Sequence, residues 1–225
     1  MKKIMFSDKF GLTEAVLSGR KTQTRRVVSE SLWNKWTEYD DFCGSVGVRG
    51  LNEIGVAVTR EYSDCEKFFL DNSPFKIGEV VAVAQSYASI VDELEDPKNF
   101  CCMEHWESAG PKRAHYAGFL YHPGMTNKMF VSAKEMPHQI RITDVRAERL
   151  QDISDEDCIA EGVCKWTKDK KLFKYDIADG FEMFEWRDMP RTPREAYAAL
   201  IDRISGNGTF ESNPYVFVYE FELIT

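Results

Sequence analysis

Residues 215–223 read Tyr-Val-Phe-Val-Tyr-Glu-Phe-Glu-Leu and form the strongest strand signal in the chain. Aromatic and β-branched residues dominate this stretch, and its second half alternates between apolar and acidic residues. The apolar run Val-Val-Ala-Val-Ala at 80–84 follows turn-like residues 74–79 and is typical of a buried strand. Shorter strand candidates lie at residues 3–6, 56–59, 130–131 and 139–142. A β-sheet is therefore expected to form the centre of the fold.

Short helices are expected around this sheet. In residues 12–18, apolar side chains recur at spacings of three and four, and Gly19 suits the left-handed turn that ends a helix. Residues 193–204 start with proline at the first helical position and carry an apolar stripe that includes Tyr197. Together with the strands, these helices predict the α+β class, as a small β-barrel or a curled sheet with short flanking helices.

A third helix is expected from Asp155 onward. Ser154 is a suitable N-cap, the acidic first turn favours the helix dipole, and Gly162 is suited to end the helix. Glu161 then lies in the last turn, where a carboxylate opposes the dipole. An acid in an unfavourable structural position points to a functional role.

Length and periodicity predict a single domain over residues 1–225 with three insertions. The chain has 225 residues, enough for one domain with a substantial core. Residues 30–75, 88–128 and 165–190 show no clear periodicity and are interpreted as loop insertions with little regular structure.

Composition limits the classes of partner. The net charge of −8 argues against binding to extended duplex nucleic acid, which usually requires a basic face. No apolar run approaches the roughly 20 residues of a membrane span. The first residues, Met-Lys-Lys-Ile-Met-Phe-Ser-Asp, do not resemble a signal peptide, so a cytoplasmic protein with reduced thiols is expected.

Residues 19–26, Gly-Arg-Lys-Thr-Gln-Thr-Arg-Arg, gather cations and hydroxyls in an acidic chain. A solvated basic turn behind a helix is the simplest interpretation, since cations favour a helix C-terminus. The functional interpretation is that Lys21 and Thr24 converge, because a desolvated lysine can lose its proton and activate a hydroxyl. Arg25 and Arg26 can stack on a nucleobase or bind a phosphate.

Metal and cofactor motifs are not evident. Cys101 and Cys102, with His105 and either His115 or His122, fit no standard zinc-finger spacing, and unpaired thiols are the simpler interpretation. The chain also lacks a phosphate-binding loop, a dinucleotide fingerprint and a nucleophile elbow. We therefore expect neither a metal nor a bound cofactor.

Several of these segments resemble one known family. Residues 19–26 resemble the G-x-K-x-x-T-x-R signature of the ASCH domain family, which has a PUA-like β-barrel fold. Residues 78–83 resemble the G-D-x-L-x-V strand of that family. Residues 142–162 and 213–221 are similar to the longer, prophage-type members. The resemblance covers both ends and the middle of the chain, and it omits the three insertions.

The resemblance implies a role in RNA metabolism. Small bacterial members of the family are amidohydrolases that deacetylate N4-acetylcytidine with a lysine, a threonine and a glutamate. Matched residue by residue, these are Lys21 as the base, Thr24 as the nucleophile and Glu161 as the proton donor. Arg25 or Arg26 would stabilise the oxyanion or hold the base.

The chain departs from the prophage-type pattern at Ala84 and Gln85, where relatives often carry Arg-Glu. Gln85 is expected to hydrogen-bond the edge of a base. This difference keeps two alternatives open, a non-catalytic RNA-binding or nucleotide-binding module and a metal-free ribonuclease. The expected partner is a modified nucleoside or a short single-stranded RNA, and the acidic net charge favours the smaller ligand.

Overall fold

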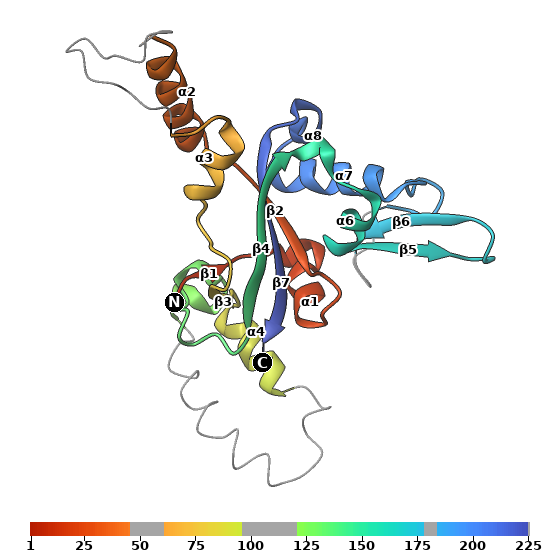
Figure 1. The fold of residues 1–225 in the computed structure, drawn as a ribbon. Coiled ribbons are helices and arrows are strands. Elements are labelled where there is room, and N and C mark those ends of the chain that lie inside the picture. Colours follow the sequence, from red (N-terminus) through yellow and green to blue (C-terminus); the bar gives the residue numbers. More distant parts are fainter. Residues whose placement is uncertain (46–60, 96–120, 178–183, 225) are drawn as a thin grey trace.

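The computed structural model describes residues 1–45, 61–95, 121–177 and 184–224. Five strands form one sheet in the order β1-β3-β4-β7-β2, and β5 and β6 form a separate hairpin (Figure 1). The strands are β1 (Lys3–Ile4), β2 (Gln23–Val27), β3 (Val80–Val83), β4 (Gln139–Arg149), β5 (Val163–Thr167), β6 (Phe173–Ile177) and β7 (Tyr215–Ile224). With the helices that surround the sheet, this arrangement confirms the predicted α+β class.

The three predicted helices are present with their expected ends. They are α1 (Leu12–Leu17), α6 (Asp155–Ala160) and α7 (Pro193–Ser205). Gly19, which follows α1 in the chain, has a φ of 72°, and Gly162, which follows α6, has a φ of 108°. Ser154 Oγ accepts a hydrogen bond from the Asp157 amide at 3.0 Å. A capping box between Thr192 and Glu195 starts α7.

The predicted insertions contain more regular structure than expected. Residues 30–75 include α2 (Glu30–Ser45) and α3 (Cys65–Asp71), and residues 88–128 include most of α4 (Tyr87–Glu95). Two short 3-10 helices follow, η3 (Pro123–Met125) and η4 (Lys128–Phe130), so the strand predicted at 130–131 is wrong. The hairpin of β5 and β6 occupies much of 165–190. The strand predicted at 56–59 lies outside the described residues.

Residues 30–45 carry a helical pattern that the loop interpretation missed, because Leu32, Trp36 and Tyr39 recur at spacings of four and three. The ring of Trp36 lies 5.5 Å from that of Phe68, and the ring of Tyr39 lies 6.0 Å from Phe68. Trp36 and Tyr39 thus lie on one face of α2 and pack on α3, and these tertiary contacts stabilise the helix.

A β-bulge decides which side chains of β4 share a face with β7. Ile142 pairs with Phe221 but Asp144 pairs with Glu220, so Thr143 is the extra residue. Beyond the bulge, Arg146 lies opposite Val218, and Val218 in turn lies opposite Arg25 of β2. Directly opposite residues point to the same face of a sheet, so the bulge aligns these two arginines across β7.

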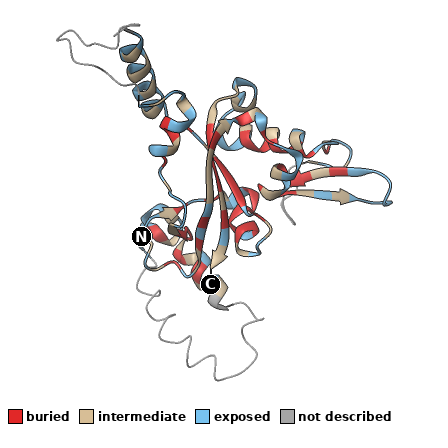
Figure 2. Ribbon diagram, viewed as in Figure 1, coloured by how far each residue is buried: buried red, intermediate tan, exposed pale blue. Residues whose placement is uncertain are grey.

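The core covers both sides of this sheet. Buried apolar residues of β4 and β7 pack with α1, α3, α6 and α7, while much of α2 and of the β5–β6 hairpin is exposed (Figure 2). The remaining short elements are η1 (Asp8–Phe10), η5 (Leu150–Asp152) and α8 (Thr209–Ser212). No helix in the described part of the chain is long and apolar enough to cross a membrane.

Strand pairing leaves β1 and β2 as the two edges of the sheet. Within the described residues no backbone ladder joins these edges, so the pairing alone does not close the predicted barrel. A side chain connects them instead, because Arg26 of β2 donates a hydrogen bond to the carbonyl oxygen of Met5, directly behind β1. The edges of the sheet thus curl toward each other.

Candidate active site

Two glycine turns bring Lys21 and Glu161 together. Behind Gly19, the Lys21 amide donates to the Ala15 carbonyl at 2.8 Å, which folds the chain back onto α1. The Thr22 amide then donates to the Ala160 carbonyl at 3.0 Å and ties this segment to the end of α6. Glu161, the residue that ends α6, consequently lies against Lys21.

The Lys21 and Glu161 side chains form a buried ion pair. Lys21 Nζ lies 2.5 Å from Glu161 Oε2 and donates a second hydrogen bond to the Glu161 carbonyl oxygen at 2.7 Å. The side chains are only 1% and 5% exposed. The predicted meeting of these two residues is therefore present in the structure.

Burial changes the acid–base properties of Lys21. Loss of water around its ammonium group lowers the pKa of Lys21, and the Glu161 carboxylate opposes this shift without cancelling it. The positive charges of Arg25 and Arg26 lower the pKa further. A lysine with a lowered pKa is more readily available as a neutral base than an exposed lysine.

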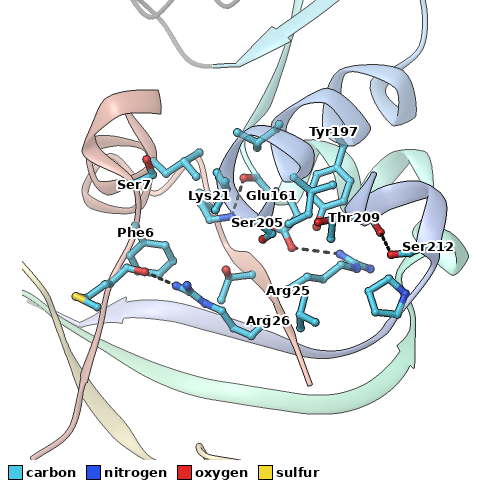
Figure 3. Close-up of a pocket in the computed structure, with 18 residues that line it drawn as sticks. Phe6, Ser7, Lys21, Arg25, Arg26, Glu161, Tyr197, Ser205, Thr209 and Ser212 are labelled. Atoms are coloured by element: carbon cyan, nitrogen blue, oxygen red, sulfur yellow. Dashed lines mark hydrogen bonds and ion pairs between the residues drawn. The ribbon is translucent and has the colours of Figure 1, made fainter. Parts of the chain in front are cut away.

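Thr24 lies on the wall of a cavity of about 330 Å³. Lys21 and Glu161 line the same cavity (Figure 3). This volume is at the lower end of the range typical of small-molecule sites. Within the described residues, the Thr24 side chain forms no hydrogen bond, so its hydroxyl is not held by a protein partner. Helices α7 and α8 supply another side of the cavity through Tyr197, Leu200, Ile201, Ile204, Ser205 and Thr209.

Arg25 is held by acidic side chains. Its Nη2 lies 2.7 Å from both Glu148 and Asp157, and its Nη1 lies 3.4 Å from Glu161. Burial opposes the charge of Arg25, but these carboxylates outweigh burial and raise its pKa. Although Arg25 lines the cavity as predicted, its donors are directed at protein acceptors, so it orients Glu161 instead of offering a free donor to a ligand.

Arg26 has a different environment. Its guanidinium lies 5.6 Å from the centre of the Phe6 ring and donates to the Met5 carbonyl. No carboxylate forms an ion pair with Arg26 in the described part of the chain. Burial lowers the pKa of Arg26, and the negative charge of Glu161 opposes that shift. Of the two predicted ligand-binding arginines, Arg26 retains the less compensated charge.

Gln85 is separated from this site. It does not belong to the cavity lining among the described residues, and its Nε2 donates to Glu93 of α4 at 3.1 Å. Glu93 also contacts His138 through a short hydrogen bond. The structure therefore brings Lys21, Thr24, Arg25, Arg26 and Glu161 together but places Gln85 in another polar cluster.

Sequence reasoning missed the acidic cluster that holds Arg25 and the contribution of α7. Glu148 and Asp157 carry no local motif, because the register of β4 and the start of α6 bring them to Arg25. Tyr197 was assigned only to the apolar stripe of its helix, and its position in that stripe does not reveal that the residue lines the cavity.

The described residues contain no cluster of three or more His, Cys, Asp or Glu side chains arranged to hold a metal ion. Cys101, Cys102, His105 and His115 lie outside the described residues. His122 caps η3 by accepting a hydrogen bond from the Gly124 amide at 2.9 Å. Comparisons with protein-family models, curated proteins and solved structures find no match to this chain.

Proposed function

We propose that the cavity hydrolyses the amide of a small modified nucleoside, with N4-acetylcytidine as the reference substrate. The observation that carries this proposal is the buried Lys21–Glu161 pair, 2.5 Å apart, in a cavity whose wall includes the unbonded Thr24 hydroxyl. These three groups are the base, acid and nucleophile that acyl transfer requires.

The Lys21–Glu161 pair can supply both proton transfers. An ammonium–carboxylate pair can shift one proton to become an amine and a carboxylic acid, and burial favours such neutral forms. The Lys21 amine takes the proton of Thr24 as its oxygen attacks the acetyl carbonyl carbon. Glu161 gives its proton to N4 as the C–N bond breaks, so cytidine leaves and the ion pair is restored.

Water then releases the acyl group. The Glu161 carboxylate accepts a proton from the attacking water, and the Lys21 ammonium returns a proton to the Thr24 oxygen as the ester bond breaks. Acetic acid leaves, and the neutral amine and acid are regenerated. Across both steps, one water is consumed for each amide cleaved.

The charge of the cavity supports a small, largely neutral ligand. Carboxylates compensate two of its three described cations, Lys21 and Arg25. The side formed by α7 and α8 carries hydroxyls and apolar groups, without lysine or arginine in the described lining. Binding of an RNA backbone relies on clustered cations, so this composition favours a nucleoside over a polynucleotide.

The proposal includes the ASCH-type, PUA-like barrel. The curled sheet and the Arg26–Met5 bond between its edges support that arrangement. The position of Gln85 also supports the proposal. Gln85 lies outside the cavity lining and contacts Glu93, so having glutamine there instead of glutamate does not change the Lys21–Glu161 pair.

The test is release of cytidine from N4-acetylcytidine by purified wild type and by the Lys21→Ala and Thr24→Ala variants. Wild type should release cytidine, and both variants should lose nearly all activity. Thr22→Ala is the matched control, since Thr22 is an exposed threonine two residues away. An inactive wild type, or variants as active as wild type, would refute the proposal. Binding without turnover would favour the non-catalytic module.

A further inference from the structure

Tyr197 carries a buried hydroxyl without a protein partner. The residue is 1% exposed, and its oxygen is one of the buried side-chain atoms that lack a hydrogen bond in the described structure. Proteins rarely leave such groups unsatisfied, because each one costs free energy of desolvation on folding. Because Tyr197 is also one of the residues that line the cavity, a ligand in the cavity is the candidate for the missing partner.

The surroundings of Tyr197 keep this hydroxyl protonated. Tyr197 lines the cavity together with Glu161 and Arg25 (Figure 3). Burial raises the pKa of Tyr197 well above its ordinary value, and the nearby Glu161 carboxylate raises it further. Near neutral pH the group is thus an O–H donor, and it suits an acceptor oxygen on the ligand.

The lysine and the two arginines in the described cavity lining already have acceptors in the protein. Lys21 Nζ donates twice to Glu161, and Arg25 donates to a set of acidic and amide oxygens. Arg26 donates to the Met5 carbonyl. Of these side chains and Tyr197, only Tyr197 has no acceptor in the described protein.

From this we infer that the Tyr197 hydroxyl donates a hydrogen bond to the carbonyl oxygen of the amide and stabilises the oxyanion that forms when Thr24 attacks. The inference rests on the proposed hydrolase function and assigns to Tyr197 the role that the sequence resemblance assigned to an arginine. As charge develops on the oxygen, a neutral donor in a water-poor site strengthens its hydrogen bond, so the effect falls on the chemical step.

Tyr197→Phe tests this inference because it removes only the hydroxyl. The kcat for N4-acetylcytidine should fall roughly 10²- to 10³-fold, as for loss of one oxyanion-hole donor. The KM should change much less, since the bond strengthens in the transition state. The ligand-free variant should melt no lower than wild type, because the removed hydroxyl had no partner in the protein.

The matched control is Tyr219→Phe. Tyr219 is equally buried, but its hydroxyl is 2.9 Å from Ser73 Oγ, outside the lining of this cavity. This control should melt below wild type and keep its kcat. Loss of kcat without loss of Tm is expected for an oxyanion donor, and loss of Tm without loss of kcat is expected for a structural hydroxyl.

Two results would overturn the inference alone: an active wild type with an unchanged kcat in Tyr197→Phe, or a ligand-free Tyr197→Phe that loses as much thermal stability as Tyr219→Phe. A wild type that releases no cytidine would instead remove the proposed function and, with it, this inference.

Discussion

The buried Lys21–Glu161 pair makes a quantitative prediction for a double-mutant cycle. Glu161→Gln leaves the Lys21 ammonium buried without a carboxylate. Among the described residues, Lys21→Met leaves the Glu161 carboxylate with only the 3.4 Å contact to Arg25. Removing one partner of a buried pair typically costs about 3–5 kcal/mol. Glu161→Gln keeps the 2.7 Å hydrogen bond from Lys21 Nζ to the backbone carbonyl of residue 161. We therefore expect this variant to lose about 3 kcal/mol of unfolding free energy, the lower end of that range.

The double variant should lose much less than the sum of the single losses. Two unit charges 4 Å apart attract by about 4 kcal/mol at an effective dielectric of 20, and the desolvation of both groups offsets part of this attraction. We expect a coupling energy of roughly 2–3 kcal/mol, because the double variant buries neither charge. Each single loss of about 3 kcal/mol corresponds to a fall in Tm of roughly 6–12 °C for a chain of this size.

Urea denaturation followed by circular dichroism measures each free energy of unfolding. The control cycle uses Arg141→Gln and Glu222→Gln, whose side chains are 2.8 Å apart but 48% and 54% exposed. Its coupling should not exceed about 1 kcal/mol. If the effects at Lys21 and Glu161 add to within about 0.5 kcal/mol, the two residues do not form the buried pair, and the argument for a shared proton fails.

Three further predictions concern stability. Thr192→Ala removes the capping box of α7 and should cost about 1 kcal/mol, seen as a lower urea midpoint at constant slope. Gly162→Ala places a side chain at a φ of 108° and should cost roughly 1–3 kcal/mol by the same measurement. Burial opposes ionisation of Asp157, but hydrogen bonds from Arg25 and Gln23 lower its pKa below 3.8. The ionised Asp157 side chain therefore stabilises the fold fully above pH 3.8, and this stabilisation is lost as the pH falls through the folded-state pKa of Asp157. The difference in Tm between wild type and Asp157→Asn should accordingly shrink as the pH is lowered through 3.8.

Each of these three stability predictions can be contradicted by a specific result. An unchanged midpoint in Thr192→Ala would show that the capping box does not stabilise α7. Wild-type stability in Gly162→Ala would show that the turn accepts a side chain, although the nearest atom, Leu12 Cδ2, lies 3.5 Å from the added carbon. A Tm difference between wild type and Asp157→Asn that is constant with pH would show that Arg25 does not hold Asp157 ionised.

Local signals in the sequence predicted the local structure well. Ser154, Pro193 and Gly19 mark helix ends because helix caps and turns depend on neighbouring residues. The strand at 215–223 was equally clear, because its residue types suit a pleated, buried surface. Helices α2 and α3 were missed, although Leu32, Trp36 and Tyr39 follow a helical spacing in α2, and aromatic contacts between the two helices stabilise them.

The sequence by itself determined the main strands, three of the helices and the two glycine turns, and it singled out Glu161 as an acid in an unfavourable position. Pattern alone offered no reason to join Glu161 to Lys21, and only the resemblance suggested it. The tertiary structure decided that these residues are bonded, that Arg25 is held by acids and that Tyr197 has an unpartnered hydroxyl. The physical reason is that caps and turns act over a few residues, whereas strand register and helix packing bring together groups far apart in the chain.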